Sequence, residues 1–272
     1  MVGTWDMPVG SGDRWPEDYE RGRPGWPAEA VDQLRLPPSA TVLEIGAGTG
    51  KLTRLLAARF AGVVAVEPAE AMRRVLASRC PGAAILAGEG GHLPLADRSV
   101  DAAFAAESFH WFHDEASVEE MARVLRDAAP LVLLWNVPAG PWEPSVADAE
   151  AVLLDRLGDV ALWHDPLDLG GPRRLPDGWA DAVAAAGFEP VVEQSLVNPQ
   201  ALDADGLVAY FASMGWIADL DDAERLALLA ELRARLTGDG YERTWTTMMC
   251  WTRREARATD RPAAAQRREP SG

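Results

Sequence analysis

Short apolar runs and helical patterns alternate through the first half of the chain. The apolar runs predict five strands, at residues 41–45, 62–66, 83–87, 101–106 and 131–135. Apolar residues at helical spacing predict helices at residues 28–34, 51–59, 69–79 and 117–125. We expect Ser117 to cap the last of these helices, with Glu120 completing a capping box. Strands and helices that alternate at this short spacing predict an α/β fold with a doubly wound parallel sheet.

The second half of the chain is less regular. We expect helices at residues 146–157 and 179–186 and two more within residues 203–237. Two further strands, at residues 189–197 and 244–253, would bring the mostly parallel sheet to seven strands. We expect a mobile N-terminal segment at residues 1–18 and a first half with the glycine-rich turn at residues 19–137. A second half at residues 138–254 adds helices and the last two strands, and residues 255–272 are expected to be a disordered tail.

A glycine-rich turn joins the first strand to the next helix. The sequence runs Glu44-Ile45-Gly46-Ala47-Gly48-Thr49-Gly50, and the helical pattern starts at once. Glycines here admit positive φ and let a ligand approach the backbone, while the helix start offers free N–H groups. A dinucleotide fingerprint needs glycine at the first, third and sixth positions, but Lys51 stands at the sixth. The spacing therefore disfavours a nicotinamide-dependent oxidoreductase.

Charge and composition narrow the class of partner. The 272 residues are 48% hydrophobic and 25% charged, which is typical of a soluble globular protein. Their net charge of −16 repels phosphate backbones, so we expect no nucleic-acid partner. We see neither a membrane span nor an export signal, and Cys80 and Cys250 lack metal-ligand spacing. We therefore expect a cytoplasmic protein with free thiols, no membrane contact and no metal site.

Acidic residues follow the first two strands. Glu67 comes 21 residues after Gly46, at the end of the second strand, where a carboxylate can accept hydrogen bonds from both ribose hydroxyls of a nucleoside. The alternative is a solvated acid at a strand end. Pro68 is expected to stop the strand and expose this carboxylate. Glu44 is expected either to cap the N–H groups of the glycine turn or to face a cationic ligand.

These motifs resemble those of the class I S-adenosylmethionine-dependent methyltransferases. The pattern Glu-x-Gly-x-Gly-x-Gly at residues 44–50 is similar to their first motif, and Glu89-Gly90 stands where relatives bind adenine. The run Glu107-Ser108-Phe109-His110-Trp111-Phe112-His113 and the segment at residues 19–27 resemble a type 11-like subgroup that acts on small molecules. The resemblance covers residues 19–136 and implies a Rossmann-like fold in which helical insertions cover the substrate side.

The resemblance also implies roles for particular residues. Expected contacts to S-adenosyl-L-methionine come from the N-terminal segment, the strand ends and the glycine turn: Tyr19, Arg23, Glu44, Gly46, Ala47, Gly48, Glu67, Pro68, Met72, Glu89, Gly90, Glu107 and Phe109. Tyr19 and Arg23 are placed near the methionine carboxylate, although Arg23 could instead form a salt bridge with the acidic surface. Phe109 and Trp111 are expected to enclose adenine or the sulfonium.

Two histidines are candidates for a general base. His110 and His113 have an unperturbed pKa in the range that suits proton removal from an acceptor. The alternative for each is a ring packed in the loop and satisfied by backbone, while His92 is expected to be a surface residue. The predicted function is methyl transfer to a small organic acceptor beneath the later helices, with Trp142, Trp163 and Trp216 as candidate walls. The alternatives are a non-catalytic binding protein for the same cofactor and, less favoured, the oxidoreductase.

Overall fold

A computed structural model describes residues 15–157, 175 and 177–256. The described strands form one sheet in the order β3-β2-β1-β4-β5-β7-β6. The strands are β1 (Thr41–Ile45), β2 (Gly62–Val66), β3 (Ala84–Leu86), β4 (Ala102–Ala106), β5 (Pro130–Pro138), β6 (Val192–Leu202) and β7 (Tyr241–Arg253). The first five are parallel, and β7 is antiparallel to both β5 and β6. The predicted seven-stranded, mostly parallel sheet is confirmed.

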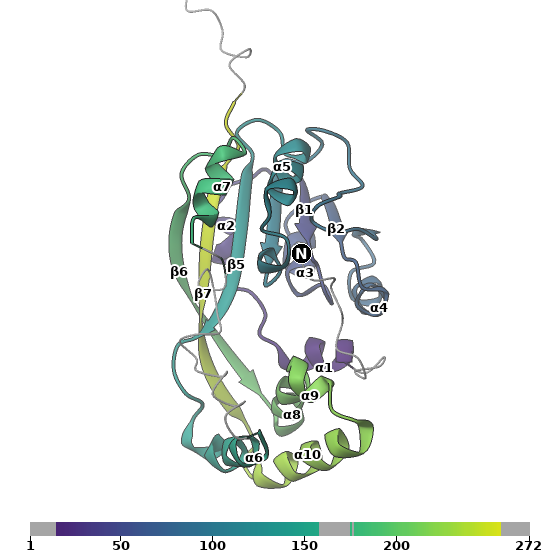
Figure 1. Ribbon diagram of the computed structural model, residues 1–272, viewed down its shortest axis with the longest axis vertical. Helices are drawn as coiled ribbons and strands as arrows, with labels where there is room; N and C mark the ends of the chain where they lie inside the picture. The colour runs from purple at the N-terminus through teal and green to yellow at the C-terminus, as the bar shows by residue number, and fades with distance from the viewer. Residues whose placement is uncertain (1–14, 158–174, 176, 257–272) are drawn as a thin grey trace, which may run out of the picture.

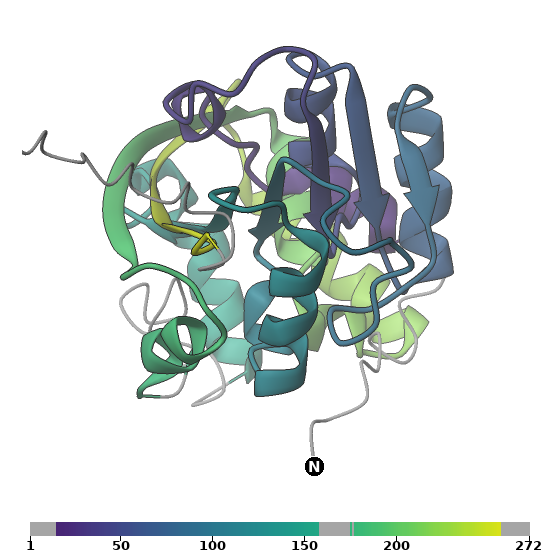
Figure 2. The same cartoon turned by 90° about the horizontal axis from the view of Figure 1, so that it is seen from above.

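Helices cover both faces of the sheet, as Figures 1 and 2 show. One apolar core lies between the sheet and the helices α5 (Glu115–Val124) and α7 (Trp179–Ala185). The core of the opposite face is formed with α2 (Glu29–Asp32) and α3 (Lys51–Ala57), and a smaller cluster joins α4 (Glu70–Arg79) to β2. Because both faces are covered, β2 and β4 have no polar side chain along their whole length.

A second lobe is built where β6 and β7 extend past the other strands (Figure 1). Its own apolar core includes Tyr241 and Trp245 of β7 and side chains from the helices around them. The elements of the lobe are η3 (Pro144–Val146), α6 (Ala147–Leu157), α8 (Ala204–Ala212), α9 (Gly215–Ala218) and α10 (Asp222–Arg235). The region predicted to hold two helices therefore holds three, and β6 runs further than expected because it pairs with almost all of β7.

Helix α1 (Trp15–Gly22) connects the lobe to the sheet (Figure 1). Its first residues fall within the segment predicted to be mobile, yet Trp15 is buried and donates from Nε1 to the carbonyl of Ser213 over 3.2 Å. Gly22 contacts α8 so closely that a Cβ on it would lie 2.1 Å from the backbone nitrogen of Tyr210. The rest of that segment, residues 1–14, and most of the predicted tail, residues 257–272, lie outside the described residues.

The predicted cap of α5 is wrong. The helix begins one turn earlier, and Asp114 is its N-cap, accepting from the backbone N–H of Ser117 over 2.8 Å. Glu120 accepts instead from the backbone of Leu93 and pairs with Arg123. No helix in the described part of the chain is long and apolar enough to cross a membrane.

Candidate cofactor site at the carboxyl edge of the sheet

The glycine turn lies at the point where the strand order reverses, between β1 and β4. Ligands of open α/β sheets bind at this point, outside the carboxyl ends of the strands. Gly46, Gly48 and Gly50 all have positive φ, of 70°, 56° and 93°. A Cβ on Gly46 would lie 2.5 Å from Cβ of Ser108, whereas a Cβ on Gly48 would meet nothing within 4 Å. Gly46 is therefore required by packing, and Gly48 leaves an open approach to the backbone.

Glu67 closes this turn from the end of β2. Its carboxylate accepts from the backbone N–H of Gly48 over 2.8 Å and from that of Ala69 over 2.9 Å. The side chain is only 1% exposed, and burial raises its pKa. The expectation that Pro68 exposes this carboxylate is wrong, because Pro68 is itself exposed while Glu67 turns inward beneath the turn. The alternative of a solvated strand-end acid fails for the same reason.

Glu44 lies beneath the same turn. It is 2% exposed, and its carboxylate accepts from the Thr53 hydroxyl in the first turn of α3. Burial and, to a smaller extent, the nearby Glu67 raise the pKa of Glu44 to about 8, although the Thr53 hydrogen bond acts in the opposite direction. One of the two expectations was that Glu44 caps the N–H groups of the turn. The structure instead shows a hydrogen bond to a side chain of α3.

The loop after β3 contributes Glu89 and Gly90. Glu89 is exposed and Gly90 is buried against Phe112, so that a Cβ on Gly90 would lie 2.4 Å from that ring. His92 donates from its backbone to the carbonyl of Glu89 over 3.0 Å, and its side chain is exposed as predicted. Glu89 is consequently free to meet a ligand, with Phe112 behind the neighbouring glycine.

The loop after β4 separates residues that the sequence grouped together. Glu107 has a φ of 52° and accepts from the backbone N–H of Asn136 over 2.7 Å. Phe109 is fully buried and packs edge-on against Phe112 and Trp179, with centroid distances of 6.0 Å to each. The expected contact of Phe109 with the cofactor is not supported, because its ring belongs to the core. Trp111 is 49% exposed at this edge.

The two candidate bases contact one another through the loop. The short helix η2 (Phe109–Trp111) brings Nδ1 of His113 within 3.1 Å of the carbonyl oxygen of His110. Both side chains are half-buried. The alternative for His113 was a ring packed in the loop and hydrogen-bonded to the backbone, and the structure shows this contact. If Nδ1 donates to the carbonyl, Nε2 is the ring nitrogen able to accept a proton.

The N-terminal segment reaches the same edge. Burial, opposed by Arg23 and assisted by the carboxylates of Glu107 and Glu67, raises the pKa of Tyr19 to about 12. Arg23 donates to the hydroxyl and carbonyl oxygens of Ser213 over 2.8 Å and 3.2 Å. Among the ion pairs of residues 15–157, 175 and 177–256, none involves Arg23, so the surface salt bridge that was the alternative for this residue is not observed.

Glu20 attaches α1 to the glycine turn, and the sequence analysis missed it. Its carboxylate accepts from the Thr49 hydroxyl over 2.6 Å and pairs with Arg54 over 2.8 Å. Its carbonyl oxygen accepts from Nζ of Lys51 over 2.6 Å. The sequence shows only that an acidic residue stands next to Tyr19. The packing of α1 is needed to show that this residue contacts the start of α3.

The remaining predicted residues lie at the rim or in the lobe. Met72 is 2% exposed and clusters with Trp15 and Ala218, so it contributes to the packing of α1 and α9 over α4. Trp142 is buried in the core of the lobe, and the half-buried Trp216 packs against that core. Trp163 lies outside the described residues.

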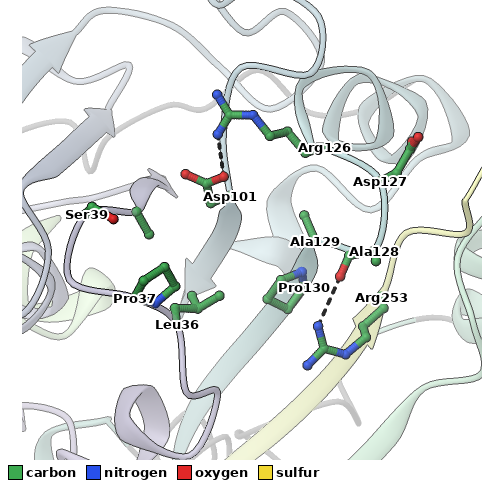
Figure 3. Close-up of a pocket in the computed structure, with 11 residues that line it drawn as sticks. Leu36, Pro37, Ser39, Asp101, Arg126, Asp127, Ala128, Ala129, Pro130 and Arg253 are labelled. Carbon is green, nitrogen blue, oxygen red and sulfur yellow. Dashed lines mark hydrogen bonds and ion pairs between the residues drawn. The ribbon is translucent and has the colours of Figure 1, made fainter.

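A shallow hollow of about 330 Å³ lies at the opposite, amino edge of the sheet (Figure 3). Asp101 and Arg126 form an ion pair across it, and Arg253 donates to the carbonyl of Ala128 over 3.0 Å. Asp101, Arg126 and Arg253 are thus all engaged within the protein, and Asp127 at the same hollow pairs with Arg98 over 3.1 Å. Within the described residues, no cluster of three histidine, cysteine, aspartate or glutamate side chains could hold a metal.

Comparison with known proteins agrees with this arrangement. Residues 43–133 match a family model described as a methyltransferase domain. An uncharacterized methyltransferase-like protein of Schizosaccharomyces pombe is 30% identical over 222 residues, which cover 79% of this chain and 81% of that protein. An uncharacterized methyltransferase of Mycobacterium tuberculosis is 46% identical over 118 residues, or 43% of this chain and 49% of that protein. The match thus spans about half the length of the mycobacterial relative.

Solved structures share the fold. A candidate type II methyltransferase from Anaeromyxobacter dehalogenans superimposes with a TM-score of 0.58 at 24% identity, covering 85% of this chain and 97% of that one. Phosphoethanolamine N-methyltransferase 2 of Haemonchus contortus, solved with S-adenosyl-L-methionine, gives 0.54 at 12% identity, covering 93% and 61%. The strand order, together with a glycine turn whose Gly48 N–H is bound by Glu67, defines a Rossmann-like methyltransferase fold. The chain belongs to the family of class I S-adenosylmethionine-dependent methyltransferases.

Proposed function

We propose that this protein transfers the methyl group of S-adenosylmethionine to a small organic acceptor. The observation that carries the proposal is the paired arrangement of Gly48 and Glu67 at the switch point of the sheet. The open space in front of Gly48 fits a ligand lying against the backbone, and the carboxylate of Glu67 is already aligned with that backbone.

The residues around the turn suit a cationic nucleoside. Glu67 would accept from the ribose hydroxyls, and Glu89 with Gly90 would meet the adenine edge. Glu67 and Glu107 place two carboxyl groups near one edge, which favours the positive charges of the amino-acid portion, whereas Glu44 keeps its proton at neutral pH because its pKa is about 8. Tyr19 and Arg23 would contact its carboxylate, because a guanidinium pairs favourably with a carboxylate in a partly closed site. We leave Phe109 out of this set because its ring is enclosed in the core.

Catalysis then depends mainly on alignment. The bound cofactor supplies a methyl carbon that its sulfonium already makes electrophilic. The protein has to hold the acceptor nucleophile in line with that carbon, and orientation can lower the barrier by about 7–11 kcal/mol in favourable cases. Nε2 of His113 is the candidate to take a proton from an acceptor that must lose one.

The lobe favours a small acceptor. Helices α6, α8 and α10 form a lobe that lies beyond the carboxyl ends of the central strands (Figure 1), and an edge covered in this way suits a small organic molecule more than a macromolecule. The net charge of −16 likewise disfavours RNA or DNA.

The test is a methyl-transfer assay. Methyl-labelled S-adenosylmethionine is incubated with the protein and a panel of small acids, phenols and amines, and both labelled product and S-adenosylhomocysteine are measured. We expect product formation with a subset of the panel, in equal amount to S-adenosylhomocysteine. Binding of the cofactor without turnover on any acceptor would favour the non-catalytic alternative, and retention of NAD but not S-adenosylmethionine would favour the oxidoreductase.

A further inference from the structure

Arg243 occupies an unusual position in the lobe. It lies near the start of β7, in the part of that strand that continues past the carboxyl end of β5, where the backbone N–H of Ala139 meets the carbonyl of Thr244 over 3.0 Å. Its side chain is only 9% exposed. Arg243 is therefore a buried cation on the same edge of the sheet as the glycine turn.

Buried arginines are ordinarily paired with an acid, because an unpaired buried charge is costly. Two other buried arginines among the described residues follow the rule, although Nε of Arg225 also lacks a hydrogen-bond partner there. Arg225 pairs with Asp18 over 2.6 Å, and Arg254 lies 3.6 Å from Asp127. Arg243 forms no ion pair with any residue in the described ranges, and its Nε atom is buried without a hydrogen-bond partner among them. Its one backbone contact is from Nη2 to the carbonyl of Gly140, over 3.1 Å.

Aromatic rings hold the guanidinium in place. Cζ of Arg243 lies 4.9 Å from the ring centroid of Trp142 and 4.8 Å from that of Trp245. Rings that approach a guanidinium through cation–π contact leave its in-plane N–H groups available, and these form the planar fork that matches a carboxylate. The surroundings therefore favour a cation and accept from it at Gly140 and Tyr210, but they leave its Nε without a partner among the described residues.

The charged groups around Arg243 determine what charge a bound ligand can carry. Burial lowers the pKa of Arg243, whereas Tyr210, which also forms a hydrogen bond with its side chain, and Glu150 favour its charged form. Glu150 of α6 is the acid that acts on it electrostatically, and burial raises the pKa of Glu150 while Arg243 lowers it. One cation in an aromatic setting matches a single negative charge better than the double charge of a phosphate.

The aromatic cluster links this cation to the cofactor edge. Tyr210 lies 5.4 Å from Trp142 and 5.8 Å from Trp245 between ring centroids, and Cζ of Arg23 lies 5.3 Å from the ring of Tyr210. Only this ring therefore separates Arg243 from the residue expected to contact the methionine carboxylate. A ligand bound by Arg243 would reach towards the methyl-transfer site.

We propose that Arg243 binds a carboxylate of the methyl acceptor, so that the protein methylates small carboxylic acids. The inference rests on the proposed function and identifies its substrate class. The guanidinium anchors the acid through its in-plane N–H groups, with the indoles of Trp142 and Trp245 packing against the apolar part of the molecule. Arg243 is a binding residue here, and it takes no part in the transfer itself.

Ligand-observed NMR with matched pairs of fragments tests the assignment. A panel of small carboxylic acids, each paired with its primary amide and its phosphonate, is screened with S-adenosylhomocysteine present and absent. We expect acids to bind the wild type about tenfold or more tightly than their amides, the effect of one charge-assisted hydrogen bond. Arg243→Gln should lose this preference, and Arg243→Lys should keep part of it because it retains the charge without the fork.

The matched control lies at the other end of the same strand. Cζ of Arg253 lies 5.6 Å from the ring of Trp251, and its guanidinium donates to a backbone carbonyl, so Arg253→Gln removes a similar group and should leave the preference intact. Acids and amides that bind the wild type equally, a preference that survives Arg243→Gln, or phosphonates that bind more tightly would each overturn the proposal. Wild-type protein that fails to bind S-adenosylhomocysteine would instead overturn the proposed function, because the fragment preference is also measured without that molecule.

Discussion

Separate alanine substitutions of Gly46 and Gly48 should affect different properties of the protein. Both glycines have positive φ, so alanine at either costs about 1–2 kcal/mol of stability. At Gly46 the new Cβ would also lie 2.5 Å from Cβ of Ser108, and overpacking of this kind adds about 1–3 kcal/mol. We therefore expect Gly46→Ala to lower the free energy of unfolding by about 2–5 kcal/mol, a large share of the roughly 5–15 kcal/mol of a typical domain.

Gly48→Ala should remain folded but bind the cofactor poorly. Its Cβ would meet no protein atom within 4 Å, so only the backbone strain lowers its stability. The methyl group would enter the space that we assign to the cofactor, and we expect affinity for S-adenosylhomocysteine to fall about tenfold or more, equivalent to about 1.4 kcal/mol. Urea denaturation and calorimetry measure the two quantities separately.

A double substitution checks the steric part of this argument. Adding Ser108→Gly to Gly46→Ala removes the clashing atom, although it also removes the hydroxyl that donates to the carbonyl of Ile45 over 2.7 Å. We expect a favourable coupling energy of about 1–3 kcal/mol between the two substitutions. Additive losses, or unchanged affinity in Gly48→Ala, would refute the reasoning.

Three further outcomes are expected. Glu44 keeps its proton in the folded state up to its pKa of about 8 but loses it near 4.5 when unfolded, so the free energy of unfolding should fall by up to about 1.4 kcal/mol per pH unit as pH rises between these values. Glu44→Gln should lack that slope in urea titrations, and equal slopes would contradict the assignment. Glu20→Ala should release α1 from Thr49 and Arg54, giving faster proteolysis within α1 and weaker cofactor binding, whereas unchanged cleavage would show that other contacts hold this helix. His113→Asn should lower kcat for acceptors that must lose a proton and spare acceptors that need not, and equal losses on both would argue against a base.

The sheet was predictable from sequence because its signal is local. Each central strand is a short apolar run ended by a polar or glycine residue, and the helices between them carry their own periodicity. The helix α1 was missed because nothing periodic marks residues 15–18 as helical. Its position depends on the close contact of Gly22 with the backbone of α8, which joins residues far apart in the sequence.

The site was predictable in outline but not in orientation. The spacing from the glycine turn to Glu67 correctly brought these two together, yet it could not show that the carboxylate turns inward to Gly48. The aromatic run after β4 likewise identified the right loop, but only packing shows that Phe109 faces the core and Trp111 the solvent. The sequence pattern predicts which residues lie at the carboxyl edge of the sheet. The direction of each side chain depends on residues that are distant in the sequence and pack against it.

Calorimetric titration of S-adenosylhomocysteine into the wild type and Glu67→Ala is the most direct test of the central claim, that Glu67 holds the ribose over the glycine turn. Loss of the carboxylate leaves two backbone N–H groups without their acceptor, so the comparison is made at a temperature where circular dichroism shows both proteins folded. We predict affinity lower by about tenfold or more, as expected when hydrogen bonds to a charged group are lost. Equal affinity in the folded variant would contradict the account.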